Sequence, residues 1–145
     1  MKRSILLLAL FLLVSHTWAV CQPDRIMFQK LTDKKGLVYA PGQKKPYTGT
    51  VFANYKNRGR RLRGEYKEGL PHGIWTYWNE EGRKERTESY KKGKKEGNWT
   101  YFDEDGIMDR IESYLNGEPS GKVTTFYGNG KREKVEFYLK GNHFS

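Results

Sequence analysis

The chain has 145 residues, of which 14% are aromatic and 30% charged, and a formal net charge of +10. This length suits one domain with a modest apolar core. The single cysteine excludes an internal disulfide, so packing alone must hold the domain together. A basic chain favours anionic partners, although net charge by itself selects none of them.

The amino terminus has the pattern of a cleavable signal peptide. Lys2 and Arg3 precede an unbroken apolar stretch, residues 5–14, and more polar residues follow it. This stretch is about half of the roughly 20 residues that a membrane-spanning helix needs. We therefore expect removal of residues 1–19, with a cut as late as residue 21, and no transmembrane span afterwards. The mature chain would be periplasmic or secreted, where nucleic acid is not an expected partner, and would keep 25 basic and 17 acidic residues, a net charge of +8.

Cys21 leaves an alternative for the mature terminus, which is lipid anchoring. A bacterial lipoprotein usually has a small residue directly before the modified cysteine and leucine three places before it. Val20 and Trp18 occupy these places here. The preferred interpretation is therefore an unpaired cysteine near the mature terminus, and the mass of the mature protein would distinguish the two.

Residues 20–45 are predicted to be a lead-in segment with the first strand. The run GLVY at 36–39, followed by PYTG at 46–49, is typical of a strand and a turn that begin a sheet.

Residues 46–145 contain an internal repeat with a period of 24 residues. Three columns of identical residues recur at this spacing: Gly49, Gly73, Gly97 and Gly121; Tyr66, Tyr90, Tyr114 and Tyr138; Gly69, Gly93, Gly117 and Gly141. The sequence thus divides into four copies, 49–72, 73–96, 97–120 and 121–144, and the first copy departs most from the others.

Each copy is predicted to form a β-hairpin. A strand of the type Gly-x-Trp-Thr-Tyr-aromatic leads to a turn closed by Gly82, Gly106 or Gly130, where a positive φ is expected. A second strand ends at the repeated tyrosine, and a second glycine turn follows it. The predicted fold is all-β, an antiparallel meander of tandem 24-residue hairpins that forms a twisted or rolled sheet, without helices. In the first copy Gly59 falls one position later than the turn glycine of the other copies.

Alternation along the strands indicates which side chains share a face. Arg86, Glu88 and Tyr90 share one face, and the same basic, acidic, aromatic order recurs in the next two copies. The aromatic residues predicted to form a binding surface are Trp75, Tyr77, Trp99, Tyr101, Tyr90 and Tyr114.

A second candidate surface is the basic stretch around the first turn, which includes Arg58, Arg60, Arg61 and Arg63. Its functional interpretation is a docking patch for an anionic partner. The alternative is a solvated turn and strand whose positive charges discourage unwanted sheet pairing.

Reaction chemistry is not predicted. His72 and His143 lack the paired ligand spacing of a zinc site, and no nucleophile elbow or phosphate-binding loop is present in the sequence. Asp103 to Glu112 resembles a calcium loop in part, but Tyr101 occupies the first place, where an aspartate is required. The expectation is a protein without catalytic, cofactor or metal sites.

The lead-in GLVY with KPYTG, and the recurring Gly-x-Trp-x-x-aromatic, turn-Gly, Tyr-x-x-Gly unit, resemble the MORN-repeat-variant proteins, which include the group labelled YwqK-type antitoxins of toxin-antitoxin systems. The resemblance covers residue 36 to the end. It implies stacked β-hairpins and a role in binding. A signal peptide departs from a cytosolic antitoxin, because an exported chain could neutralise only an exported toxin, as an immunity protein does.

Two classes of function follow from these patterns. The first is an exported, non-enzymatic module that binds another protein and is antitoxin-like or immunity-like. The second is an envelope-associated module that binds anionic lipid, peptidoglycan or polysaccharide through its basic patch.

Overall fold

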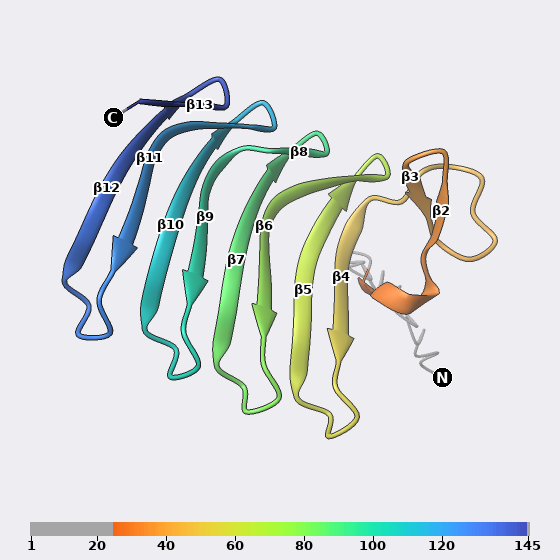
Figure 1. Cartoon of the computed structure of the whole chain (residues 1–145). Coiled ribbons are helices and arrows are strands. Elements are labelled where there is room, and N and C mark those ends of the chain that lie inside the picture. The colour runs from red at the N-terminus through yellow and green to blue at the C-terminus, as the bar shows by residue number, and fades with distance from the viewer. Residues whose placement is uncertain (1–24, 145) are drawn as a thin grey trace, which may run out of the picture.

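The computed structural model describes residues 25–144 (Figure 1), so the predicted signal peptide, its cleavage site and Cys21 lie outside the described residues. Within this range no helix is long and apolar enough to cross a membrane.

One sheet contains most of the described chain (Figure 1). Its strands from the first repeat onward are β4 (Gly49–Asn54), β5 (Arg60–Lys67), β6 (Leu70–Trp78), β7 (Lys84–Lys91), β8 (Lys94–Lys95), β9 (Gly97–Phe102), β10 (Met108–Leu115), β11 (Glu118–Phe126), β12 (Arg132–Leu139) and β13 (Asn142–Phe144). Apart from β8, each strand from β4 to β12 pairs antiparallel with the next strand along the chain. The short strand β8 pairs with β7, and β7 also pairs with β9. The predicted antiparallel all-β meander is therefore confirmed.

The lead-in segment forms β1 (Arg25–Met27), a short 3-10 turn η1 (Phe28–Lys30), β2 (Thr32–Lys34) and β3 (Leu37–Tyr39). The strand expected at 36–39 corresponds to β3, but β3 pairs with β2 in a separate two-stranded sheet. The main sheet begins instead with β1, which pairs parallel to β4.

The strands that open each later repeat bend sharply near their amino-terminal ends, as β6, β9 and β11 show in Figure 1. Gly73, Gly97 and Gly121 lie within the first four residues of these strands and have φ angles of +67°, +77° and +101°. Only glycine adopts such angles without strain, so the repeated glycine column bends the sheet.

The turns between the two strands of a hairpin follow the prediction in the later copies, since Gly82, Gly106 and Gly130 have φ angles of +82°, +81° and +75°. In the first copy the equivalent position is Arg58, with φ +67°, and Gly59 follows it in an ordinary conformation.

The buried core lies on one face of the sheet at the first repeat. Its members are Tyr47, Val51, Ala53, Leu62, Tyr66 and Trp75. Toward the carboxyl end the same face becomes more polar, and Trp99 and Val123 are its buried apolar residues there.

Candidate functional site

Aromatic rings run across this face from strand to strand. Ring centroids are 5.0 Å apart for Tyr66 and Trp75, 6.3 Å for Trp75 and Tyr90, 5.4 Å for Tyr90 and Trp99, and 5.3 Å for Trp99 and Tyr114. Most of these contacts are edge-to-face, the geometry that the ring quadrupole favours. The row is therefore a continuous packing element.

The two tryptophans predicted to belong to a binding surface are buried. Trp75 and Trp99 are 4% and 6% exposed. Their indole N–H groups donate to the carbonyl oxygens of Glu65 and Ser89, each at 3.1 Å. Neither ring is open to a large partner, which differs from the expectation and leaves them as core residues.

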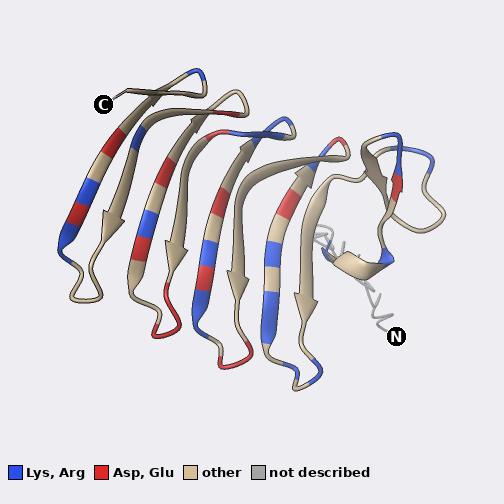
Figure 2. Ribbon diagram, viewed as in Figure 1, with Lys and Arg blue, Asp and Glu red and all other residues tan. Residues whose placement is uncertain are grey.

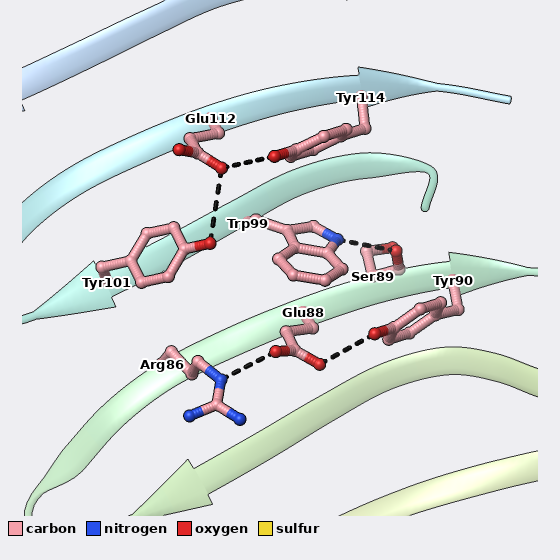
Figure 3. A network of polar contacts seen from close by, with 8 residues as sticks. All are labelled: Arg86, Glu88, Ser89, Tyr90, Trp99, Tyr101, Glu112 and Tyr114. Carbon is pink, nitrogen blue, oxygen red and sulfur yellow. Dashed lines mark hydrogen bonds and ion pairs between the residues drawn. The ribbon is translucent and has the colours of Figure 1, made fainter. Parts of the chain in front are cut away.

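Buried carboxylates accompany the rings (Figure 3). Glu88, 6% exposed, accepts a hydrogen bond from Arg86 Nε at 2.7 Å and one from the Tyr90 hydroxyl at 3.0 Å. The basic, acidic and aromatic residues that alternate in the sequence thus form one hydrogen-bonded network. In it the buried Glu88 carboxylate has both an ion-pair partner and a hydrogen-bond donor, which offsets the cost of burying its charge.

The next repeat has the same network. Glu112, 8% exposed, accepts from the hydroxyls of Tyr114 at 2.6 Å and Tyr101 at 3.3 Å, and Arg110 also donates to it. In the last repeat Glu136 accepts from Lys134 at 2.9 Å but is more exposed. The networks therefore loosen toward the carboxyl end.

Burial, followed by the charge of Glu88, raises the pKa of Tyr90 and raises that of Tyr77 to about 12. Burial and the hydrogen bond to Glu112 raise the pKa of Tyr114. These phenols therefore stay protonated and act as donors to the carboxylates at neutral pH. The predicted surface residues Tyr77, Tyr90, Tyr101 and Tyr114 are largely engaged within the sheet.

The first repeat lacks this network. At the positions of Arg86 and Glu88 it has Leu62 and Gly64, which lie 24 residues earlier. Both are buried, and Leu62 belongs to the apolar core. In the first repeat apolar packing therefore takes the place of the ion pair and hydrogen bonds of the later repeats.

The cations of the first repeat lie elsewhere, on the β4–β5 turn and along β5, where Figure 2 shows blue segments, with a red segment toward the carboxyl end of β5. The next two hairpin turns have red segments instead. Lys56 stands where the next two repeats have Glu80 and Glu104. Arg61 stands where the later repeats have acidic residues, and Arg63 where they have Thr87, Ile111 and Val135.

These cations lack acidic partners. Among the ion pairs of residues 25–144, all of which lie in later repeats, none involves Lys56, Arg58, Arg60, Arg61 or Arg63. Arg60 instead lies 5.8 Å from the centroid of the Trp78 ring. The four predicted arginines therefore lie on one turn and the strand that follows it, and no ion pair among the described residues neutralises this basic surface.

Arg58 is held in a strained conformation. Its φ of +67° costs a non-glycine residue on the order of 1 kcal/mol. The turn around it is fixed by Asn57, whose Oδ1 accepts from the Gly59 amide at 2.8 Å and whose Nδ2 donates to the Glu80 carbonyl at 3.2 Å. A positive charge thus occupies a position that favours glycine.

Arg63 borders a shallow hollow of about 320 Å³ on the opposite face of the sheet from the aromatic row. Ile74, which also lines it, is 67% exposed. The basic surface therefore adjoins an exposed apolar side chain.

Other candidates have structural roles. The Nδ1 atom of His72 is buried without a hydrogen-bond partner. The equivalent side chains, Thr48 and Glu96, accept from the backbone amides of Glu68 and Asn116.

Asp103, in the partial calcium template, uses Oδ1 to accept from the amides of Asp105 at 3.0 Å and Ile107 at 2.8 Å, which shapes its own turn. The described residues include no cluster of three or more groups that could hold a metal ion.

No protein-family model, curated protein or solved structure matches this chain. The resemblance to the MORN-repeat-variant family therefore rests on the repeat residues alone and stays a prediction.

Sequence reasoning missed two features of this face, the burial of the carboxylates and the change at Gly64. Aligning Gly64 with Glu88 and Glu112 would have found the second, because the 24-residue spacing places all three in one column.

Proposed function

We propose that this protein is an exported, non-enzymatic binding module whose basic first repeat docks against an acidic surface of a partner protein, as an immunity-type protein would. The observation that carries the proposal is the set of cations on β5 and its preceding turn that have no acidic partner. Arginine predominates in this set, and its planar guanidinium suits bidentate contact with carboxylates.

The exposed Ile74 beside Arg63 favours a protein over an anionic polysaccharide. Protein interfaces combine apolar contact with a charged rim, whereas a polyanion is attracted by charge alone. The apolar core of the first repeat, which includes Leu62, Tyr66 and Trp75, fixes the sheet beneath this surface.

Two double variants with the same net charge test the proposal. Lys56→Glu with Arg61→Glu removes the basic surface, and each new glutamate matches the residue 24 positions later, Glu80 and Glu85. Lys92→Glu with Lys94→Glu is the control on a distant turn, matching Glu68 and Glu118. Because these residue types already occur at equivalent positions, both variants should fold.

Capture from the native envelope fraction, followed by titration calorimetry with the purified partner, gives the readout. We expect the wild type and the Lys92/Lys94 control to capture one stoichiometric protein, and the Lys56/Arg61 variant to lose it. The affinity for this protein should fall as the salt concentration rises. Retention by both variants would refute the basic docking surface.

Ile74→Asn separates the two classes of partner, since Asn98 occupies the equivalent position. A protein partner should bind this variant at least about tenfold more weakly, because a buried apolar contact is lost. Binding to peptidoglycan, which attracts the basic surface by charge, should be unaffected by it. If no protein is captured and the wild type binds phosphatidylglycerol vesicles or peptidoglycan in a way that the Lys56/Arg61 variant does not, the envelope-binding alternative would be established instead.

A further inference from the structure

An aromatic hollow of about 170 Å³ lies where the lead-in segment meets the second repeat. It is on the face of the aromatic row, away from the basic surface. Its lining consists of five rings and a proline: Phe28, Tyr66, Pro71, Trp75, Tyr77 and Tyr90.

The hollow exists because Trp75 leans toward Gly64. A Cβ atom at Gly64 would lie only 2.1 Å from the Trp75 ring, so the ring occupies space that a side chain would otherwise fill. Trp75 is accordingly 5.0 Å from Tyr66 but 6.3 Å from Tyr90.

Trp99, the equivalent residue one repeat later, has Glu88 in the column where Trp75 has Gly64. It lies almost midway between its neighbours, 5.4 Å from Tyr90 and 5.3 Å from Tyr114. The missing side chain at position 64 therefore widens the gap on the Tyr90 side of Trp75.

In the next repeat an ammonium group occupies the corresponding place. Lys95 Nζ lies 3.8 Å from the centroid of the Trp99 ring and 4.4 Å from that of Tyr114. Within residues 25–144 it belongs to no ion pair. The position of this ammonium against the two rings is the geometry of a cation–π contact.

Pro71 is the structural equivalent of Lys95. Pro71 pairs with Tyr66 as Lys95 pairs with Tyr90, and their carbonyl oxygens accept from Gly93 and Gly117, each at 2.9 Å. The hollow thus has the same Trp and Tyr walls as the place that Lys95 occupies, but no lysine. Phe28 adds a further ring to it, which contacts Trp75 edge-on with the centroids 6.3 Å apart.

The local charges permit a cation in the hollow. Arg86 lies 3.7 Å from the Tyr77 ring centroid, and Glu88 balances its charge through the 2.7 Å ion pair. In the next repeat the equivalent pair, Arg110 and Glu112, coexists with the Lys95 ammonium. A further positive charge beside such a pair is therefore compatible with this architecture.

We propose that the hollow binds a trimethylammonium group of the choline type. Its walls are rings and proline, which suit methylated nitrogen better than a bare ammonium, because a bare ammonium needs hydrogen-bond acceptors or water. The site is separate from the basic docking surface, so the two proposals can fail independently.

The test is a titration of the full mature protein with choline, followed through the indole N–H resonances in nuclear magnetic resonance spectra. Choline should shift the Trp75 signal saturably and leave the Trp99 signal in place. The neutral isostere dimethylbutanol should bind at least about tenfold more weakly, because it lacks the charge that the rings attract. Equal affinities, or no shift of Trp75 at tens of millimolar choline, would overturn the proposal.

Two lysine variants test the occupancy of the hollow. Pro71→Lys places the protein's own ammonium in the hollow and should abolish choline binding. Lys95→Ala is the matched control, because it removes the ammonium beside Trp99 and should leave the choline-induced shift of Trp75 unchanged. Thermal unfolding checks that both variants are folded. If Pro71→Lys does not fold, the comparison of choline with dimethylbutanol decides, and equal affinities count against the proposal.

Phosphatidylcholine vesicles distinguish the two sources of the ligand. Sedimentation of the wild type with these vesicles, lost in Pro71→Lys, would identify a lipid head group. Binding of soluble choline without vesicle binding would identify a free molecule. Either result supports the trimethylammonium site.

Discussion

Replacing Gly64 with alanine tests how the first repeat packs. The added Cβ would lie 2.1, 2.4 and 2.5 Å from three atoms of the Trp75 ring, far inside the carbon–carbon contact distance of about 3.5 Å. Trp75 can retreat only toward Tyr90, into the aromatic hollow, and this movement would break the hydrogen bond that its indole N–H donates to the Glu65 carbonyl. Overpacking costs about 1–3 kcal/mol and a lost hydrogen bond about 1 kcal/mol. We therefore expect Gly64→Ala to lower the free energy of unfolding by about 2–4 kcal/mol.

Urea unfolding followed by tryptophan fluorescence measures this change, and Gly128→Ala is the matched control. Gly128 has open space around its Cβ position and no positive φ, so its replacement should change the free energy of unfolding by less than about 0.5 kcal/mol. In thermal unfolding the Gly64 variant should melt roughly 10 °C lower. If the two variants prove equally stable, the packing of Trp75 against Gly64 is wrong.

Three further changes test other parts of the sheet. Arg58→Gly should raise the free energy of unfolding by about 0.5–1 kcal/mol by removing the strain at φ +67°, whereas Arg58→Ala should not; equal effects of the two in urea unfolding would assign the change to charge. Because burial and the charge of Glu88 raise the pKa of Tyr77 from 10.0 to about 12, the folded state keeps a proton that the unfolded state loses. Stability should hold up to about pH 10 and fall as pH rises toward 12, less steeply in Tyr77→Phe; identical profiles would contradict this. Glu88→Ala should lower the free energy of unfolding by about 2 kcal/mol, since it leaves the Arg86 guanidinium and the Tyr90 hydroxyl without their acceptor. Glu136→Ala should lower it less, because Glu136 is more exposed. A larger loss for Glu136→Ala would contradict the role given to the buried network.

The meander could be predicted because its signals are local. A glycine that must adopt a positive φ and a tyrosine that ends a strand recur every 24 residues, and each marks a turn or a strand end by itself. The pairing of β1 with β4 could not be predicted in this way. It joins short segments with no shared pattern, and its parallel direction depends on the path of the chain between them.

The site was harder to predict, since alternation tells which side chains share a face but not whether that face is covered. Trp75 and Trp99 do lie on the face of Tyr77 and Tyr101, yet neighbouring tyrosines enclose them. Enclosure results from the close spacing of adjacent hairpins and from the bends at the repeated glycines. These are properties of the assembled sheet.

The two proposed sites share an origin in the first repeat. Each later repeat has a basic and an acidic residue that bind one another within the sheet, as Arg86 and Glu88 do in the second repeat. The first repeat replaces that pair with Leu62 and Gly64, so apolar packing alone completes its core. Its cations on β5 and the preceding turn are then not required for the fold, and Arg58 remains at a position where glycine would be more stable. The same Gly64 lets Trp75 lean away from Tyr90 and opens the aromatic hollow. The replacement of one basic and acidic pair by Leu62 and Gly64 thus accounts for both features. It leaves the basic surface without acidic partners, and it leaves the aromatic hollow without a side chain to fill it.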